Sequence, residues 1–274
     1  MGTLRADPGV ISDLDAYLDA APRADADPVE TGAFTLFVSR TPWNYYARPT
    51  LIHPKPIVAT DLDQLATVCV EHGVALEIEW VSEVHPELAD LAAGHGLQLA
   101  THALMIADRF APTAPAPDGA TIRVVNADDP ALLSGRAVAD VSFAVGGTAP
   151  GPGSSAERDA AAAGLAADHI AHLRDCHRGG LMITVVAESS DGVLAVGSYK
   201  PVGDTAEVLG VATLPCVRRR GLAAAVTTAL VGHACQHGVR TVLLSAQNED
   251  VARVYTRVGF HQVGTTCSAS LPPD

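Results

Sequence analysis

One stretch near the end of the chain constrains the fold more than any other. An apolar, β-rich run that includes Val211 is followed by three arginines, Gly221 and an Ala-rich segment beginning at Leu222. This order predicts a strand, a tight turn and a helix. The first amides of a helix have no intrahelical partner and lie at the positive end of its dipole, so such a turn favours an anion. Because Gly221 lets the backbone approach a bulky ligand and Ala223 and Ala224 keep the first turn open, the pattern predicts a pyrophosphate cradle.

The same stretch closely resembles the acyl-CoA-binding core of the GCN5-related N-acetyltransferase (GNAT) family. The signature of that family is Arg/Gln-x-x-Gly-x-Gly/Ala after a strand, and Arg218, Gly221 and Ala223 match it by position. A glycine motif alone would be weak evidence. The chain also has the features that accompany the signature in the family, namely a second strand Thr241–Ala246, then Asn248, Tyr255 and Gly259-Phe260. The resemblance covers roughly residues 121–270.

The resemblance implies an α/β (α+β) fold, in which helices flank a mixed, mostly antiparallel sheet. Residues 121–274 alternate as such a fold requires. We expect strands at Thr121–Val125, Leu181–Glu188, Val193–Tyr199, Thr205–Thr213, Thr241–Ala246 and His261–Ser270. We expect helices at Ala131–Phe143, Glu157–Asp175, Leu222–His237 and Glu249–Val258, with a flexible loop at Gly146–Ser155.

A Pro/Ala-rich segment without periodicity divides the chain. It predicts a semi-rigid linker at 111–120 between an N-terminal domain, 1–110, and a catalytic domain, 121–274. From Asp61 onward the expected order helix–strand–helix–strand repeats the order of Leu222–Ser270, without an Arg-x-x-Gly-x-Ala signature. We interpret the first part as a degenerate GNAT-like domain in tandem with the second; an α/β domain of unrelated ancestry stays open.

Composition and charge limit the partners of the chain. With 18 Lys+Arg against 31 Asp+Glu, the net charge is −13, so we expect neither nucleic acid nor an anionic membrane as a partner. No apolar run approaches the roughly 20 residues that span a bilayer, and the first residues do not have the pattern of a signal peptide. Five scattered cysteines without a CxxC pair predict reduced thiols. We expect a cytoplasmic protein.

The resemblance also implies which residues contact the donor. The strand end would offer backbone groups to the pantetheine arm and one N–H to the thioester carbonyl, and the turn would hold the pyrophosphate. The implied donor-binding set is Val211, Ala212, Thr213, Arg218, Arg219, Arg220, Gly221, Leu222, Ala223, Ala224, Asn248 and Ala252.

Two side chains are the expected catalytic groups. Asn248, Ala252 and Tyr255 are spaced i, i+4 and i+7, which predicts one helix face, and the resemblance makes Tyr255 the group that stabilises the departing thiolate. The reference pKa values put proton transfer from Tyr to a thiolate uphill by about 2 kcal/mol, so a hydrogen bond from Tyr255 is the favoured form of that role. Glu207 is the candidate base for the acceptor ammonium, and a solvated strand glutamate is the equal alternative.

A cluster on the expected helix Glu157–Asp175 raises the question of a metal. His169, His172 and Cys176 are spaced i, i+3 and i+7. Their spacing matches no zinc pattern, so we expect no metal. In the family that the chain resembles, this helix lines the acceptor side, which makes the three residues a polar face over the acceptor pocket; a plainly solvated helix face is the alternative. The preceding loop, Gly146–Ser155, is then a candidate mobile lid.

These features together predict an N-acyltransferase. It would move an acyl group, with acetyl as the first candidate, from acyl-CoA to a primary amine of a small molecule by direct attack on the thioester. Two alternatives stay open: the same fold acting on an acyl group carried by the phosphopantetheine of an acyl carrier protein, and a non-catalytic CoA-binding or interaction module. The acceptor amine is not predicted, because acceptor pockets vary freely on one scaffold.

Overall fold

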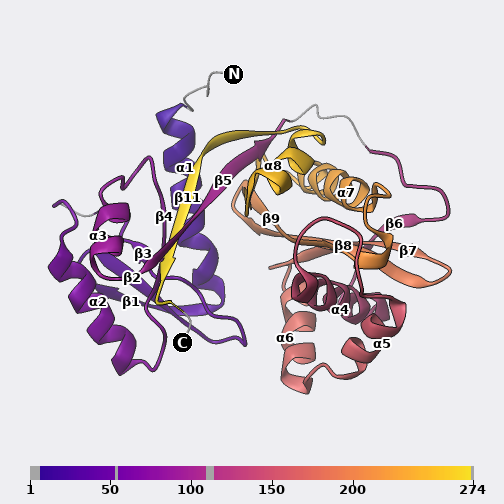
Figure 1. Ribbon diagram of the computed structural model, residues 1–274, viewed down its shortest axis with the longest axis horizontal. Coiled ribbons are helices and arrows are strands. Elements are labelled where there is room, and N and C mark those ends of the chain that lie inside the picture. The colour runs from indigo at the N-terminus through magenta and orange to yellow at the C-terminus, as the bar shows by residue number, and fades with distance from the viewer. Residues whose placement is uncertain (1–6, 53–54, 109–113, 273–274) are drawn as a thin grey trace. The chain divides into compact units, whose positions relative to one another are not determined.

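The computed structural model describes residues 7–52, 55–108 and 114–272, and the chain divides into two compact units (Figure 1). Unit 1 consists of residues 1–105, 245–248 and 262–274, and unit 2 of residues 106–244 and 249–261. Each unit is described below by itself. Among the described residues, no helix combines the length and the apolar character that crossing a membrane requires.

Unit 2 is built on the strands β10-β9-β8-β7-β6, in that spatial order. All neighbours are antiparallel except β9 and β10, which run parallel. Its elements in chain order are β6 (Thr121–Val125), α4 (Pro130–Val145), α5 (Ser155–Ala163), α6 (Ala167–Arg178), β7 (Ile183–Ser189), β8 (Gly192–Val202), β9 (Thr205–Thr213), a 3₁₀ turn (Pro215–Val217), α7 (Leu222–Gln236), β10 (Thr241–Ala246) and α8 (Glu249–Thr256). The mixed, mostly antiparallel sheet with helices on it confirms the predicted fold class.

Helices α4 and α7 cover opposite faces of this sheet (Figure 1). A Cβ added to Gly135 of α4 would lie 3.0 Å from Cγ2 of Val196, whereas a Cβ on Gly197 would lie 2.9 Å from Cδ1 of Leu230 on α7. Because consecutive strand residues point to opposite faces, Val196 and Gly197 place the two helices on different sides of β8. Two glycines thus let both helices approach the sheet closely.

The predicted helix Glu157–Asp175 is wrong as a single element. The chain forms α5 and α6 instead, separated by Gly164-Leu165-Ala166. Gly164 is the C-cap of α5, where its amide bonds back to the carbonyls of Ala160 and Ala161. The Ala-rich composition on both sides of Gly164 hid this break, since glycine costs only about 1 kcal/mol inside a helix.

The parallel pairing of β9 and β10 is short. Thr241–Leu243 pair with Thr205–Glu207, and the register stops there, although β9 continues to Thr213. On its other side, β9 stays paired with β8 up to Thr213. The register of this pairing shifts beside Gly210, which has a positive φ of 63°. From Val208 to Thr213, therefore, one edge of β9 has backbone groups that do not pair with β10.

Unit 1 has a three-stranded sheet, β1-β2-β3, and the strands β4-β11-β5. Its elements are α1 (Pro8–Ala20), a 3₁₀ turn (Ala21–Ala24), β1 (Ala26–Thr31), β2 (Phe34–Ser39), β3 (Arg48–Pro49), α2 (Ala59–Glu71), β4 (Glu77–Val81), α3 (Leu88–Gly94), β5 (Gln98–Ala107) and β11 (Phe260–Ser270). Strand β1 was not predicted, because Asp27 and Pro28 are rare in strands. From α2 onward the order α2-β4-α3-β5 is the expected helix–strand–helix–strand order.

The last strand of the chain belongs to unit 1, which differs from the predicted division. The sequence placed residues 121–274 in one domain, but Thr266–Ser270 of β11 pair with Glu77–Val81 of β4. The predicted linker at 111–120 falls partly on residues 111–113, which lie outside the described part of the chain. Its described part is anchored, since the amide of Ala114 donates to Oγ1 of Thr228 on α7 at 3.2 Å.

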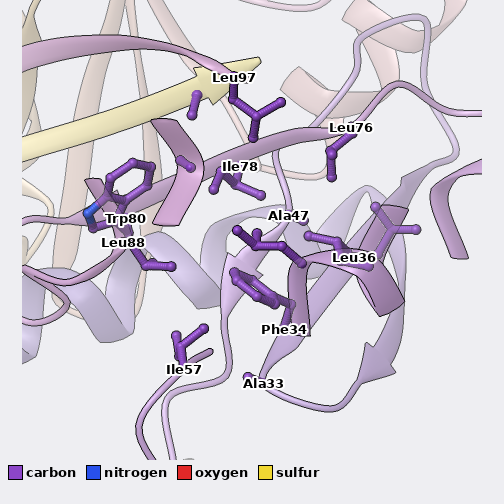
Figure 2. Packing of buried hydrophobic residues seen from close by; sticks show 14 of the residues in the cluster. Ala33, Phe34, Leu36, Ala47, Ile57, Leu76, Ile78, Trp80, Leu88 and Leu97 are labelled. Carbon is purple, nitrogen blue, oxygen red and sulfur yellow. The ribbon is translucent and has the colours of Figure 1, made fainter. Parts of the chain in front are cut away.

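The core of unit 1 is a cluster of buried apolar side chains between its helices and strands (Figure 2). Trp80 and Ile78 of β4, Phe34 of β2, and Leu62 and Leu65 of α2 are all fully buried. Burial of side chains of this size contributes about 1.5–3 kcal/mol each. The helices and strands of unit 1 therefore have a core of their own.

Candidate active site

The turn that precedes α7 leaves the start of the helix open. Its N-cap is Gly221, in the left-handed conformation (φ 83°), and no side chain caps the helix. In contrast, Asp129 caps α4 and Ser154 caps α5 through side-chain oxygens. The first amides of α7, from Leu222 to Ala224, thus point their unpaired N–H groups out of the helix end, where an anion is favoured.

The backbone of this turn is strained at an arginine. Arg219 has φ 64°, the one non-glycine residue with positive φ in the described part of the chain. Such strain costs about 1–3 kcal/mol and tends to occur at functional sites. Arg219 and Arg220 are exposed, whereas Leu222 is buried and anchors the helix start. The turn therefore presents two arginine side chains and the free amides of α7 on one short segment.

The side chain of Arg218 does not extend into solvent beside its neighbours. Nη1 donates to the carbonyls of Gly146 and Ala149 at 2.8 and 3.1 Å, and Nη2 donates to the carbonyl of Ser142 at 2.9 Å. Nε donates to the carbonyl of Thr213 at 3.3 Å. Partial burial lowers the pKa of the Arg218 guanidinium from its ordinary value. Four of its five N–H donors are thus bound to backbone carbonyls.

The end of β9 supplies the other half of the predicted donor site. Val211 and Thr213 are half-buried and Ala212 is buried, all within the part of β9 that does not pair with β10. Oγ1 of Thr213 is buried without a hydrogen-bond partner among the described residues. A buried hydroxyl without a partner costs free energy, so this end of β9 is less well satisfied than the rest of the strand.

Glu207 lies where β9 still pairs on both sides. In register it stands opposite Lys200 on β8 and beside Leu243 on β10. Residues directly opposite in an antiparallel pair have side chains on the same face. Ser198, two residues before Lys200, shares that face, which is also the face that α4 covers. Glu207 is half-buried and Lys200 is only 7% exposed, so the carboxylate lies beside a largely desolvated cation.

Tyr255 lies on α8, and burial raises its pKa to about 12. Its ring meets that of Phe260 edge-on, with 5.7 Å between centroids. Ala252 is on the same helix, but Asn248 is not, because α8 begins at Glu249 and Asn248 lies in the exposed bend before it. The predicted shared helix face therefore holds for Ala252 and Tyr255 and is wrong for Asn248.

The polar residues of α6 form hydrogen bonds within unit 2. Sγ of Cys176 lies 3.2 Å from Nε2 of His172. Nδ1 of His177 donates to the carbonyl of Leu173 at 2.7 Å, and its Nε2 lies 2.9 Å from Oγ1 of Thr184. Burial lowers the pKa of His177. These contacts make His177 a packing residue between α6 and β7, a role that the sequence pattern did not indicate.

One residue near the site was missed by sequence reasoning. Oγ of Ser142, in the last turn of α4, lies 3.0 Å from the carbonyl of Thr213 and 2.6 Å from that of Val138, and its single hydrogen is donated to one of them or shared between both. A lone serine in an apolar helix gives no signal in a single sequence, since helix serines commonly bond to the carbonyl four residues before them.

Residues 155–260 match the sequence model of the Acetyltransferase (GNAT) family. A GCN5-related N-acetyltransferase from Kribbella flavida has a similar structure, with a TM-score of 0.72 at 18% identity, covering 98% of each chain. A GCN5-related N-acetyltransferase from Sphaerobacter thermophilus follows with a TM-score of 0.58 at 16% identity, covering 98% of this chain and 95% of that one.

A third similar structure is a tandem GNAT protein from the clavulanic acid biosynthesis pathway. Its TM-score is 0.55 at 15% identity, covering 99% of this chain and 98% of that one. At these identities the structures show a shared fold that extends over nearly the whole chain. No curated protein sequence matches the chain. The family match over residues 155–260, on a fold shared with whole GNAT structures, identifies a GNAT-family acetyltransferase domain within this chain.

Proposed function

We propose that unit 2 binds acyl-CoA, with acetyl-CoA as the first candidate, and transfers the acyl group to a primary amine of a small molecule. The observation that carries this proposal is the uncapped start of α7 at Gly221, which follows the unpaired edge of β9 by only a few residues. A pyrophosphate at the helix start would leave the pantetheine arm of the same molecule within reach of that edge. Acyl transfer from acyl-CoA is the activity of the family.

The donor would be held mainly by backbone groups. The amides of Leu222, Ala223 and Ala224 would bind the pyrophosphate, and Arg219 and Arg220 would add charge from the exposed side of the turn. Val211, Ala212 and Thr213 would pair with the pantetheine amides along the open edge of β9, in the manner of an added strand. Asn248, before α8, and Ala252, on it, complete the proposed set.

The reaction would proceed by direct attack. The amine nitrogen forms a bond to the thioester carbon, the carbonyl oxygen becomes an oxyanion that a β9 backbone N–H stabilises, and the C–S bond then breaks. Tyr255 would donate a hydrogen bond to the departing thiolate. With a pKa of about 12 against a thiol near 8.5, full proton transfer is uphill by roughly 5 kcal/mol. The hydrogen bond is therefore the chemical role that the site supports.

Glu207 would take the proton of the acceptor ammonium, directly or through a water molecule. An alkylammonium near pKa 10 is almost fully charged at pH 7 and cannot attack in that form. Glu207 is half-buried and is the last residue of β9 that pairs with β10, directly before the open edge. This position supports the assignment. Lys200, opposite it on β8, places a positive charge on the same face of the sheet as the proposed base.

A second candidate is the same reaction with an acyl group on the phosphopantetheine of an acyl carrier protein. Arg219 and Arg220 favour it, because they form an exposed cationic pair on a chain of net charge −13 and would meet an acidic carrier surface. A non-catalytic CoA-binding module is the third reading. We propose neither a nucleic-acid nor a membrane partner and no catalytic metal, and we place the protein in the cytoplasm.

The test is an acyl-transfer assay in which product formation is followed by mass spectrometry. Purified protein would be incubated with acetyl-CoA and a panel of primary amines, and in parallel with an acetylated carrier protein. Acetylated amine formed from acetyl-CoA supports the proposal. Product from the carrier alone supports the second candidate, and binding of acetyl-CoA without product from either donor supports the third.

A further inference from the structure

We infer that Arg218, the first residue of the signature, is a positioning residue and not a ligand of the pyrophosphate. Its side chain ties the loop between α4 and α5 to the donor turn, residues 214–221, which connects β9 to α7. This α4–α5 loop, residues 146–154, precedes α5 and α6, and the family resemblance implies that this region borders the acceptor. The inference rests on the proposed function for the identity of the donor, and on geometry alone for the role of the side chain.

The guanidinium joins three separate segments. Its acceptors are the carbonyl of Ser142 in the last turn of α4, those of Gly146 and Ala149 in the α4–α5 loop, and that of Thr213 at the end of β9. None of these acceptors is a carboxylate, so the positive charge is balanced by carbonyl dipoles, including those at the negative end of α4. A planar fork with five donors can serve four carbonyls at once, whereas a lysine has three donors on one atom.

The same loop is bound to the donor turn by backbone contacts. The amide of Gly151 donates to the carbonyl of Pro215 at 3.2 Å, and the amide of Cys216 donates to the carbonyl of Gly153 at 3.2 Å. A Cβ on Gly153 would lie only 2.9 Å from ring carbons of Pro215. The α4–α5 loop therefore packs directly on the 3₁₀ turn that leads into Arg218 and the α7 start.

These hydrogen bonds and packing contacts hold the donor turn and the α4–α5 loop together, so we expect the two segments to become ordered together. An anion bound at Gly221 would fix the backbone of residues 218–221. The hydrogen bonds from the Arg218 side chain would then restrict the motion of Ser142, Gly146 and Ala149 as well. Because four of its five N–H donors are bound to carbonyls, Arg218 could bind a phosphate through two parallel hydrogen bonds only by releasing at least one carbonyl. The donor would in this way order the loop that borders the acceptor side before the amine binds.

Hydrogen exchange and calorimetry test the inference with acetyl-CoA as the probe, because no acceptor needs to be known. Arg218→Lys keeps the positive charge but replaces the planar guanidinium, so it cannot bind the four carbonyls at once. We expect its affinity for acetyl-CoA to fall by less than about threefold, while amides in residues 146–154 exchange at least about tenfold faster. Acetyl-CoA should protect these amides in the wild type and not in Arg218→Lys.

Arg220→Lys is the matched control, since Arg220 is an exposed arginine of the same turn. It should leave exchange in residues 146–154 unchanged. Arg218→Gln, which the family signature also accepts, keeps two side-chain donors and should give intermediate exchange if Arg218→Lys does not fold. An affinity loss of more than about tenfold in Arg218→Lys with unchanged loop exchange would overturn the inference, because it would make Arg218 a phosphate ligand.

The outcome is separable from that of the proposed function. If the wild type does not bind acetyl-CoA, the proposed function fails. The comparison of loop exchange between the wild type and Arg218→Lys without ligand still decides whether the guanidinium holds the loop. Equal exchange in the two would refute the positioning role even in a chain that binds acetyl-CoA well.

Discussion

Glu207 on β9 stands directly opposite Lys200 on β8, and Lys200 is only 7% exposed. The pair places a carboxylate and a largely buried cation on one face of the sheet, next to the strand edge that would hold the thioester. We expect Glu207→Gln to lower kcat/KM about 100-fold near pH 7, because the acceptor then has no base. The loss should shrink as the pH approaches the pKa of the amine, where the acceptor deprotonates in solution.

The control for this variant is Glu188→Gln. Glu188 is a strand glutamate too, on β7, where it pairs with Arg123 at 2.9 Å and lies away from β9. Its kcat/KM should stay close to that of the wild type. A pH-rate profile in which Glu207→Gln is equally slow at all pH values would argue for a structural role of Glu207 instead of a base.

Tyr255→Phe tests the hydrogen bond to the thiolate. We expect kcat to fall about 10- to 100-fold with little change in acetyl-CoA affinity, since the bond forms as the C–S bond breaks. Because burial raises the pKa of Tyr255 to about 12, the hydroxyl stays protonated until the pH rises through that value. The wild-type kcat should therefore show no loss from this group up to pH 10. Unaltered kcat in Tyr255→Phe would remove Tyr255 from the mechanism.

The buried ion pairs of unit 1 predict an effect on the stability of that unit. Arg48, with 2% of its side chain exposed, pairs with Asp15 at 3.0 Å and with Glu79. Arg48→Met should lower the free energy of unfolding by about 3–5 kcal/mol, because Asp15 keeps an uncompensated buried charge. Arg40→Met is the control. Arg40 pairs with Asp27, and 49% and 66% of the two side chains are exposed, so its loss should cost less than about 1 kcal/mol.

Urea denaturation followed by circular dichroism measures both variants. A loss of similar size in Arg48→Met and Arg40→Met would contradict the distinction between buried and exposed pairs.

The predictable part of the fold was local. The strand ending at Thr213, the glycine turn and the helix from Leu222 follow from residue types that only a few backbone conformations accommodate, and the structure has all three at the predicted places. The break at Gly164 was missed because flanking alanines favour helix on both sides. The place of β11 in unit 1 could not be predicted, since strand pairing over long sequence separations leaves no trace in a local pattern.

The candidate site was predictable in its backbone and less so in its side chains. A signature defines where an anion-binding turn lies, because the turn depends on glycine and on the direction of a helix. It does not define where a long side chain goes. Arg218 is followed by two more arginines, Arg219 and Arg220, yet in the described part of the chain it is Arg218 whose side chain bonds to the carbonyls of Ser142 and Gly146. That choice depends on carbonyls contributed by α4, about 70 residues earlier in the chain.

The central claim, that the turn at Gly221 binds an acyl-CoA, is tested most directly by calorimetric titration with acetyl-CoA. Gly221→Glu adds a negative side chain where the anion would lie, and Gly203→Glu is the matched control. Gly203 also has positive φ, 60°, with open space around it, and it lies in the β8–β9 turn.

We predict that the wild type and Gly203→Glu bind acetyl-CoA with similar affinity and that Gly221→Glu loses at least about 100-fold. Equal binding by Gly221→Glu and the wild type, or no binding by the wild type, would contradict the account.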